Sequence, residues 1–468
     1  MKRCLPFAIA SALLIAALPA AALRPPNVVV IISDDQGFAD ISFNPHHPRE
    51  VSTPRLDALA REGVWFSQAY ITGNVCSPTR AGLMTGRYQQ RAGVYTGGEG
   101  GAGMAQSEKL FPRFLTPAGY TSAAYGKWHI GLTVAQSPVG RGFDEWYGFL
   151  GRGAHDYFDL AQKNEDVGPM YRNGKEIKDE GYMTTRLTDE AVAFIQRQKA
   201  NPFFVYLAYN AVHAPAQAPA EDIARWRKQF PEITEARAIL MAMLHHLDLG
   251  VGRVVDTLKK EGVWDNTLLF FLTDNGGSKA MSAMNTPLRG AKQQNYEGGI
   301  RTPFIASWPA GFKGGRTIDT PIVALDILPT ALDAAGLAPD RPLDGRSLLP
   351  LLTGKADRHT DTFFWSEGGE AGGFAVRSGD WKLVQQRGER KVELFDLAKD
   401  PAEKNDLAGT HPDRLAELTR LYDAWLDQMA EPLSGAPKRP GAQGAAVAKK
   451  SKAEKRQSRD VERAKKKQ

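Results

Sequence analysis

The chain has 468 residues, of which 42% are hydrophobic and two are cysteines, and this length predicts a large domain with a smaller one beside it rather than one small core. The net charge of +6 comes from the C-terminus. Residues 438–468 hold 12 Lys and Arg against 3 Asp and Glu, and the residues before them hold 47 Lys and Arg against 50 Asp and Glu. The body of the protein is therefore mildly acidic, which argues against a nucleic-acid partner.

The first 22 residues have the pattern of an export signal. Lys2 and Arg3 precede an apolar run at residues 5–18, and three alanines at residues 20–22 form a small-residue cleavage site. Cys4 lies before the apolar run, where a lipid anchor is not attached. Since no later stretch is apolar for long enough to span a membrane, we expect an exported protein, periplasmic or secreted, without a membrane span. A short N-terminal membrane anchor is the alternative.

Three continuous apolar runs are typical of strands buried on both faces of a parallel sheet. They cover residues 27–32, 203–207 and 267–272. Amphipathic helical patterns occur at residues 54–62, 184–199 and 239–262. Strands alternating with helices predict an α/β fold with a mostly parallel central sheet flanked by helices. In such a sheet the active site lies beyond the carboxyl ends of the strands.

Polar side chains follow each of these three strands at that end. Asp34 and Asp35 come after the first, His213 after the second, and Asp274 with Asn275 after the third. Carboxylate and amide oxygens suit Ca²⁺ or Mg²⁺ rather than zinc. Turns at strand ends also favour Asp and Asn, but two such pairs after equivalent strands predict a metal site.

Cys76 is the only cysteine beyond the export signal, so it has no partner for an internal disulfide. Pro78 fits the first turn of a helix, and Arg80 projects from the same helix end. Cys76 would then lie where backbone N–H groups attract an anion. A buried apolar residue, a metal ligand and a nucleophile are possible roles, but its neighbours favour the precursor of a modified residue.

Further cationic and imidazole side chains occur without an obvious structural purpose. Lys127 and His129 flank Trp128, and Lys292 precedes a Glu-Gly-Gly segment. Taken singly, such residues are usually surface or satisfied polar groups. Together with Arg80 they would surround an oxyanion with charge-assisted donors beside a divalent cation. This combination predicts hydrolysis of a phosphate or sulfate ester.

Beyond residue 354 the pattern changes to short strands divided by Gly and Asp turns. The predicted strands cover residues 363–365, 374–377, 381–384 and 393–395, and a helix follows at residues 412–429. We therefore assign residues 23–355 to the large domain and residues 356–436 to a smaller α+β domain with an antiparallel sheet. The basic tail at residues 437–468 has no apolar stripe and is typical of a disordered or solvated segment. Attachment to a polyanion is the alternative.

The run at residues 76–87 resembles the signature of the type I sulfatases, the formylglycine-dependent arylsulfatase family of the alkaline phosphatase superfamily. Residues 76–80 match its C-x-P-x-R core and residues 83–86 its Leu-x-Thr-Gly element. The resemblance covers nearly the whole chain beyond the export signal. It includes the motifs at residues 34–35, 126–129, 141–144, 274–276, 292–299, 343–348 and 394–401. It implies that the large domain is alkaline-phosphatase-like.

The resemblance implies hydrolysis of a sulfate ester, on a carbohydrate or another small molecule, through a covalent sulfo-enzyme intermediate. A maturation enzyme would oxidise Cys76 to formylglycine, and one hydroxyl of its hydrated gem-diol would attack sulfur before the other expels sulfate. Calcium would assist this reaction. The resemblance places it between residue 76 and the oxygen ligands Asp34, Asp35, Asp274 and Asn275.

The resemblance also implies roles for the remaining candidates. Arg80 would hold the diol in its charged state, and Lys127 and Lys292 would neutralise the sulfate. His129 would assist the diol and His213 would protonate the leaving oxygen, tasks suited to side chains that titrate near neutrality.

Two loops are candidates for substrate contacts. His155 and Asp156 lie in a segment whose polar and aromatic side chains could hold a sugar, although a packed loop is an equal alternative. The glycine-rich residues 97–103 are predicted to form a mobile rim.

Two other functions fit the same residues. The first is hydrolysis of a phosphate or phosphonate ester on the same scaffold. The second is a non-catalytic binder of sulfated glycans, with Cys76 unmodified and the basic tail supplying affinity.

Overall fold

The computed structural model describes residues 24–151, 155–161 and 168–439. The predicted export signal and nearly all of the predicted basic tail lie outside these residues.

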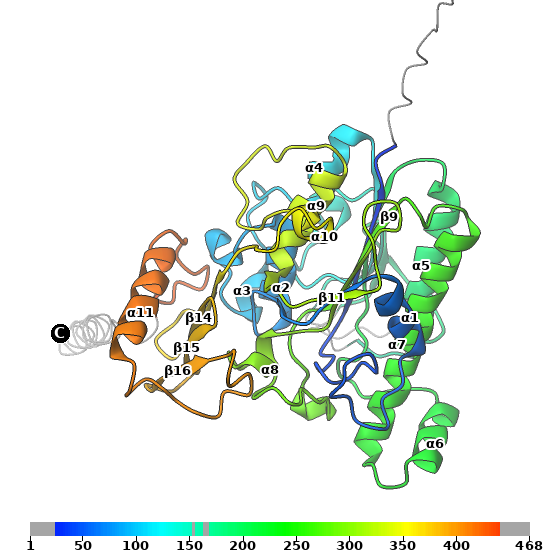
Figure 1. The fold of residues 1–468 in the computed structure, drawn as a ribbon. Helices are drawn as coiled ribbons and strands as arrows, with labels where there is room; N and C mark the ends of the chain where they lie inside the picture. The colour runs from blue at the N-terminus through cyan, green and yellow to red at the C-terminus, as the bar shows by residue number, and fades with distance from the viewer. Residues whose placement is uncertain (1–23, 152–154, 162–167, 440–468) are drawn as a thin grey trace, which may run out of the picture.

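A ten-stranded sheet forms the centre of the large domain (Figure 1). In order across the sheet its strands are β11 (Arg316–Ile318), β2 (Val64–Phe66), β10 (Phe304–Ser307), β9 (Thr267–Thr273), β1 (Asn27–Ser33), β8 (Phe203–Ala208), β4 (Thr121–Lys127), β5 (Glu145–Phe149), β6 (Met170–Arg172) and β7 (Lys175–Ile177). The five neighbours from β9 to β5 pair in parallel. Antiparallel pairs occur on either side of them, so the prediction of a mostly parallel sheet is confirmed.

Strand β1 lies at the middle of the sheet because its β-branched side chains pack on both faces. Every residue of β1 is buried. Val28, Val30 and Ile32 join the apolar core on one face, and Val29 and Ile31 join the core on the other. Alternation of side chains along a strand produces this division, and the continuous apolar run in the sequence reflects burial on both faces.

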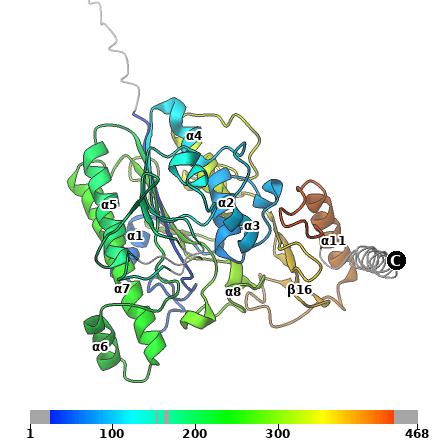
Figure 2. The same cartoon turned by 180° about the vertical axis from the view of Figure 1, so that it is seen from behind.

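Helices cover both faces of the sheet. Figures 1 and 2 show α1 (Pro54–Glu62), α5 (Met183–Gln198), α6 (Ala220–Gln229) and α7 (Glu235–Lys260) together on one face. The other face carries α2 (Cys76–Thr85), α3 (Gly97–Ala102), α4 (Phe111–Leu115), α8 (Glu297–Ile300), α9 (Ile327–Ala334) and α10 (Leu349–Leu352). Short 3-10 helices connect these elements at Gln89–Ala92, Thr116–Ala118, Val134–Gln136, Val139–Arg141, Lys279–Met281 and Ala324–Asp326.

Among the described residues, one helix has the length and composition to cross a membrane. This helix is α7, and 72% of its most apolar window is buried inside the protein. Burial on that scale is typical of a core helix packed against a sheet.

A smaller antiparallel sheet follows the large domain in the sequence. Its strands are β13 (Thr362–Ser366), β14 (Phe374–Ser378), β15 (Trp381–Gln385) and β16 (Val392–Asp396). Helix α11 (Pro412–Leu426) packs on this sheet through Tyr422, which stacks on Phe374 at 4.3 Å between ring centroids. The helix ends three residues before the predicted end. This sheet lies on the side of the molecule opposite α5 and α7 (Figure 2).

The smaller sheet shares one continuous apolar core with the large domain. Trp365 donates from Nε1 to the backbone oxygen of Ile71 at 2.6 Å. The ring of Tyr70 stacks on Phe363 at 5.8 Å between centroids. Tyr70 belongs to a second, two-stranded sheet formed by β3 (Ala69–Tyr70) and β12 (Ile322–Val323). The smaller sheet is therefore fixed close to the segment that leads into α2.

Candidate active site

The polar residues predicted at the strand ends meet at one edge of the central sheet. Asp34 directly follows β1 and Asp274 directly follows β9, and the two strands pair in register through Ser33 and Thr273. The backbone of Asp35 donates to Asp274 Oδ1 at 3.4 Å. Parallel strands bring their carboxyl ends to the same edge, so residues 240 positions apart become neighbours.

Cys76 is the first residue of α2, as the sequence predicted. Its thiol donates to Asp34 Oδ1 at 3.5 Å and accepts from Lys292 Nζ at 3.4 Å. Burial and the nearby carboxylates of Asp274 and Asp34 raise the pKa of the Cys76 thiol far above its usual range. The side chain is therefore a protonated thiol and not the thiolate that cysteine nucleophiles require.

Arg80 binds the two carboxylates that follow the central strands. Its guanidinium is fully buried and donates to Asp274 Oδ2 at 2.8 and 3.0 Å and to Asp34 Oδ2 at 3.2 Å. A third donor reaches the backbone oxygen of Lys127 at 2.9 Å. Burial raises the pKa of Asp34, but the charges of Lys127, His213, Arg80 and Lys292 together lower it well below its usual range. Asp34 is therefore a stable carboxylate.

Lys127 and His129 follow β4 and approach Asp34 from the other side. Lys127 donates from Nζ to Asp34 Oδ2 at 2.5 Å, and both side chains are fully buried. Burial together with the positive charges of Lys127 and Arg80 lowers the pKa of His129, so its imidazole is neutral. Its Nδ1 has no hydrogen-bond partner within the described part of the chain. Ser77 fixes the His129 backbone by donating to its oxygen at 2.6 Å.

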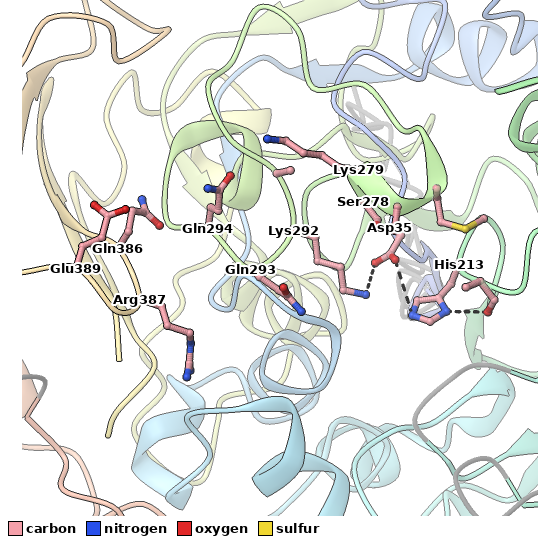
Figure 3. Close-up of a pocket in the computed structure, with 14 residues that line it drawn as sticks. Asp35, His213, Ser278, Lys279, Lys292, Gln293, Gln294, Gln386, Arg387 and Glu389 are labelled. Carbon is pink, nitrogen blue, oxygen red and sulfur yellow. Dashed lines mark hydrogen bonds and ion pairs between the residues drawn. The ribbon is translucent and has the colours of Figure 1, made fainter. Parts of the chain in front are cut away.

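Lys292, Asp35 and His213 form the part of the site that faces a pocket (Figure 3). Lys292 donates to Asp35 Oδ1 at 2.6 Å, and His213 Nε2 lies 3.8 Å from Asp35 Oδ2. His213 Nδ1 lies 2.8 Å from the backbone oxygen of Ala214. Because that oxygen can only accept, Nδ1 carries the proton in the neutral ring and Nε2 is free to exchange one.

The group fits a hard divalent cation. Ligand atoms of Asp34, Asp35, Cys76 and His213 all lie within 4.8 Å of one another. Asn275 donates from Nδ2 to Asp35 Oδ1 at 2.8 Å, and its Oδ1 is buried without a partner among the residues described here. A buried acceptor with no donor is unfavourable, and the oxygens of Asp34, Asp35 and Asn275 are ligands that suit Ca²⁺ or Mg²⁺. Sequence reasoning did not place His213 in this group.

The pocket beside this group has a volume of about 640 Å³. Asp35, His213 and Lys292 contribute from the large domain, and Gln386 and Arg387 contribute from the smaller sheet. Gln386 and Arg387 were not identified from the sequence, because the sequence of a turn between short strands does not indicate which distant loop the turn will face.

The two predicted substrate residues, His155 and Asp156, do not line this pocket. His155 is fully buried with its ring 5.3 Å from that of Phe149, and its Nδ1 contacts the backbone oxygen of Asp156 at 2.9 Å. Asp156 accepts two backbone N–H groups of its own loop and the Gln217 amide at 2.7 Å. These contacts favour the packed-loop alternative.

The glycine-rich segment is not the predicted loop but the short helix α3. Thr96 accepts from the backbone of Glu99, and Glu99 accepts from the backbone of Thr96 at 2.9 Å. This reciprocal capping box stabilises a helix start despite the low helix propensity of glycine. A Cβ at Gly100 of α3 would collide with Ser77, whereas one at Gly101 would make an ordinary contact with the His129 ring.

Comparison with known proteins identifies two family models that match this chain. The model described as Sulfatase matches residues 26–337, and the one described as N-sulphoglucosamine sulphohydrolase, C-terminal, matches residues 291–430. N-acetylgalactosamine-6-sulfatase of Mus musculus is 33% identical over 86% of this chain and 80% of its own length. The uncharacterized sulfatase YdeN of Escherichia coli is 30% identical over 87% of each chain. The crystal structure of Ps i-CgsB in complex with k-i-k-neocarrahexaose is 34% identical, with a TM-score of 0.81 over 88% of this chain and 94% of the other.

Proposed function

The chain belongs to the sulfatase family and is a sulfuric ester hydrolase, and from this premise we propose that it removes sulfate from a carbohydrate with a nucleophile derived from Cys76. The family membership confirms the resemblance carried by residues 76–87. The observation that carries the proposal is the state of Cys76, a buried and protonated thiol held between Asp34 and Lys292 at the start of α2. Such a thiol is a poor nucleophile but is well placed as the precursor of one.

A carbohydrate substrate is supported by the comparisons and by the pocket. The mouse relative is named for sulfated N-acetylgalactosamine, and Ps i-CgsB was solved with an oligosaccharide. A volume of about 640 Å³ falls within the range of roughly 300–1,000 Å³ typical of small-ligand sites. The pocket therefore has room for a sugar next to the sulfate.

Formylglycine at position 76 would supply a hydrated aldehyde whose hydroxyl attacks sulfur. The fixed helix start of α2 directs residue 76 towards Asp34 and Lys292. Lys292 reaches the Cys76 sulfur and so lies where it can contact a sulfate oxygen near that atom. Arg80 holds Asp34 and Asp274 in place, and Lys127 holds Asp34 from the other side.

His213 is the residue that would protonate the oxygen of the leaving alcohol. Its Nδ1 is fixed on the Ala214 carbonyl, and its Nε2 lies toward Asp35 beside the pocket. The neutral His129, with Nδ1 free of partners among the described residues, would accept a proton from residue 76.

Calcium would be held by Asp34, Asp35, Asp274, Asn275 and residue 76. Bound there it would polarise a sulfate oxygen as a Lewis acid. Titration of metal-free protein with CaCl₂, followed by melting temperature, tests this assignment. We expect stabilisation by Ca²⁺ that Cys76→Ala retains and Asn275→Leu loses. Equal stabilisation of Asn275→Leu would contradict the assignment.

Mass spectrometry of the tryptic peptide that contains Cys76 tests the nucleophile directly. Protein from its natural host should show the mass decrease of a thiol converted to an aldehyde. Unmodified cysteine in active protein would overturn the proposal. Parallel assays with 4-nitrophenyl sulfate and 4-nitrophenyl phosphate address the alternative reaction, and faster phosphate turnover would favour a phosphate esterase.

We also propose that the protein is exported, on the strength of the pattern in residues 1–22. N-terminal sequencing of protein recovered outside the cytoplasm should begin at residue 23. A mature chain that begins at Met1 in the cytoplasm would contradict this proposal.

A further inference from the structure

Arg387 lies where two pockets beside the active site meet. It follows β15 in the turn that leads to β16, and it lines both the pocket of about 640 Å³ and a second pocket of about 290 Å³. Figure 3 shows Gln386, Arg387 and Glu389 on one side of the larger pocket and Asp35 with His213 on the other. A molecule that fills this pocket from the catalytic side therefore extends towards Arg387.

The side chain of Arg387 is held in place from behind by Glu367. The Glu367 carboxylate accepts from Arg387 Nε and also from Asn74 Nδ2 at 2.7 Å and Asn295 Nδ2 at 3.0 Å. Glu367 is 8% exposed and Arg387 is 51% exposed at the side chain. An arginine has five N–H donors, so anchoring through Nε leaves the outer edge of the guanidinium for a ligand.

Gln386 adds a second donor at the same place. It is 6% exposed and lines the larger pocket, and its Oε1 accepts from the backbone of Asn295 at 3.0 Å. Its Nε2 has no hydrogen-bond partner within residues 24–151, 155–161 and 168–439. A buried donor without an acceptor is unfavourable, and a ligand oxygen in the pocket would satisfy it.

We propose that Arg387 and Gln386 bind a second sulfate group on the glycan whose first sulfate ester is cleaved near residue 76. This inference rests on the proposed function. A guanidinium edge matches the oxygens of a sulfate through paired hydrogen bonds, and an amide N–H supplies a further donor. The nearby carboxylate of Glu389, which also lines the pocket, opposes an anion and limits the affinity. The smaller sheet thus selects for substrates that carry more than one sulfate.

Competitive inhibition of 4-nitrophenyl sulfate hydrolysis tests the proposal, with sucrose octasulfate as the polysulfated probe and inorganic sulfate as the single-sulfate probe. Arg387→Ala should raise the inhibition constant of sucrose octasulfate about tenfold, as expected for a lost charged hydrogen bond, and leave that of inorganic sulfate unchanged. Gln386→Glu keeps the acceptor for Asn295 but replaces the donor with a negative charge, and should raise the constant further. Glu389→Gln should lower it.

Arg390→Ala is the matched control, because Arg390 is exposed in the same turn and lies outside both pockets. Its inhibition constant for sucrose octasulfate should equal that of the unchanged protein. The same inhibition of Arg387→Ala and Arg390→Ala by sucrose octasulfate would overturn the proposal, and so would a failure of sucrose octasulfate to compete.

A separate measurement distinguishes this inference from the proposed function. If the unchanged protein does not hydrolyse 4-nitrophenyl sulfate or any sulfated sugar, the proposed function fails. Calorimetric titration with sucrose octasulfate then still tests whether Arg387 binds a sulfate group, because any binding to the basic tail is common to all variants. Weaker binding by Arg387→Ala than by Arg390→Ala supports the subsite, and equal binding overturns it.

Discussion

Two groups of fully buried charges among the residues that the structure describes differ in what they leave unsatisfied. The first, the catalytic cluster, consists of Asp34, Arg80, Lys127 and Asp274 at the edge of the central sheet. The second, the bridging cluster, consists of Glu297, Lys382 and Glu403 and joins α8 to the smaller sheet. Both contain ion pairs whose side chains have no exposed surface.

The bridging cluster is closed. Lys382 Nζ lies 2.9 Å from Glu297 Oε1 and 2.9 Å from Glu403 Oε1. The second oxygen of Glu297 accepts from Tyr70 at 2.6 Å, and the second oxygen of Glu403 accepts from the Glu297 backbone at 2.6 Å. Each carboxylate oxygen therefore has an ion-pair or hydrogen-bond partner, with Glu403 Oε1 held by the Lys382 ion pair alone among the described residues, and the cluster has a structural role.

The catalytic cluster opens onto a cavity. It adjoins the Asn275 oxygen, which no described residue satisfies, and the exchangeable Nε2 of His213, and Asp35 connects both to the pocket. Burial of charge therefore does not by itself indicate function. Buried charge beside a pocket, with acceptors that no described residue satisfies, indicates a site for a cation and an anionic substrate.

The largest expected effect comes from the nucleophile. Cys76→Ala should lower kcat for 4-nitrophenyl sulfate by at least about 10⁴-fold, because loss of a covalent nucleophile removes the whole pathway. Initial rates measure this loss, and the melting temperature should stay close to that of the unchanged protein. Retention of more than a hundredth of the activity would show that residue 76 is not the nucleophile.

The next effect concerns His213, the proposed acid that lies beside the catalytic cluster. His213→Ala should lower kcat by about 10²–10⁴-fold on a sulfated sugar, as typical for loss of a general acid. The loss should be smaller on 4-nitrophenyl sulfate, because 4-nitrophenolate leaves without protonation. Rates on both substrates measure this difference, with His46→Ala, an exposed histidine, as the control. Equal losses on the two substrates would exclude the leaving-group role.

The bridging cluster should affect stability instead of chemistry. Lys382→Met leaves two buried carboxylates without their cation and should lower the free energy of unfolding by about 3–5 kcal/mol. Denaturant titration measures it, while kcat of the folded fraction should not change. Lys399→Met removes an exposed lysine of the same sheet region that pairs with Asp396 and should have little effect. A similar loss in both variants would contradict the distinction.

The smallest effect is a pH dependence within the bridging cluster. Burial raises the pKa of Glu403 to about 7, with the charge of Glu297 adding to it against the opposing charge of Lys382. The folded state therefore binds this proton more tightly than the unfolded state, where the pKa is about 4.3. The proton on Glu403 therefore adds to the free energy of unfolding below pH 4, and this contribution is lost as the pH rises through 7.

Glu403→Gln should remove this loss. Relative to the unchanged protein, the variant should gain about 3 kcal/mol of unfolding free energy between pH 4.5 and pH 8. Glu297 stays ionised in this window, because Lys382 lowers its pKa to about 2 although burial raises it. Urea titrations across the pH range measure the gain, and parallel pH profiles for the two proteins would contradict it.

Much of the catalytic cluster could be predicted because it follows from local patterns. The continuous apolar runs required buried parallel strands, and Asp34 and Asp274 follow two of them directly. Parallel strands place their carboxyl ends together, so the spacing alone predicted that these carboxylates meet. The turn residues Gln386 and Arg387 could not be predicted in this way, because their position depends on how the smaller sheet packs on the large domain.

The sequence by itself determined the α/β fold, the helix that begins at Cys76 and the residues that meet at the strand ends, since strand and helix periodicity are local properties. Only the tertiary structure decided which of the charged residues are open to a ligand. It enclosed Lys382 between two glutamates, buried His155 in its own loop and brought Arg387 to the pocket. These outcomes depend on contacts between segments far apart in the chain, which local patterns do not specify.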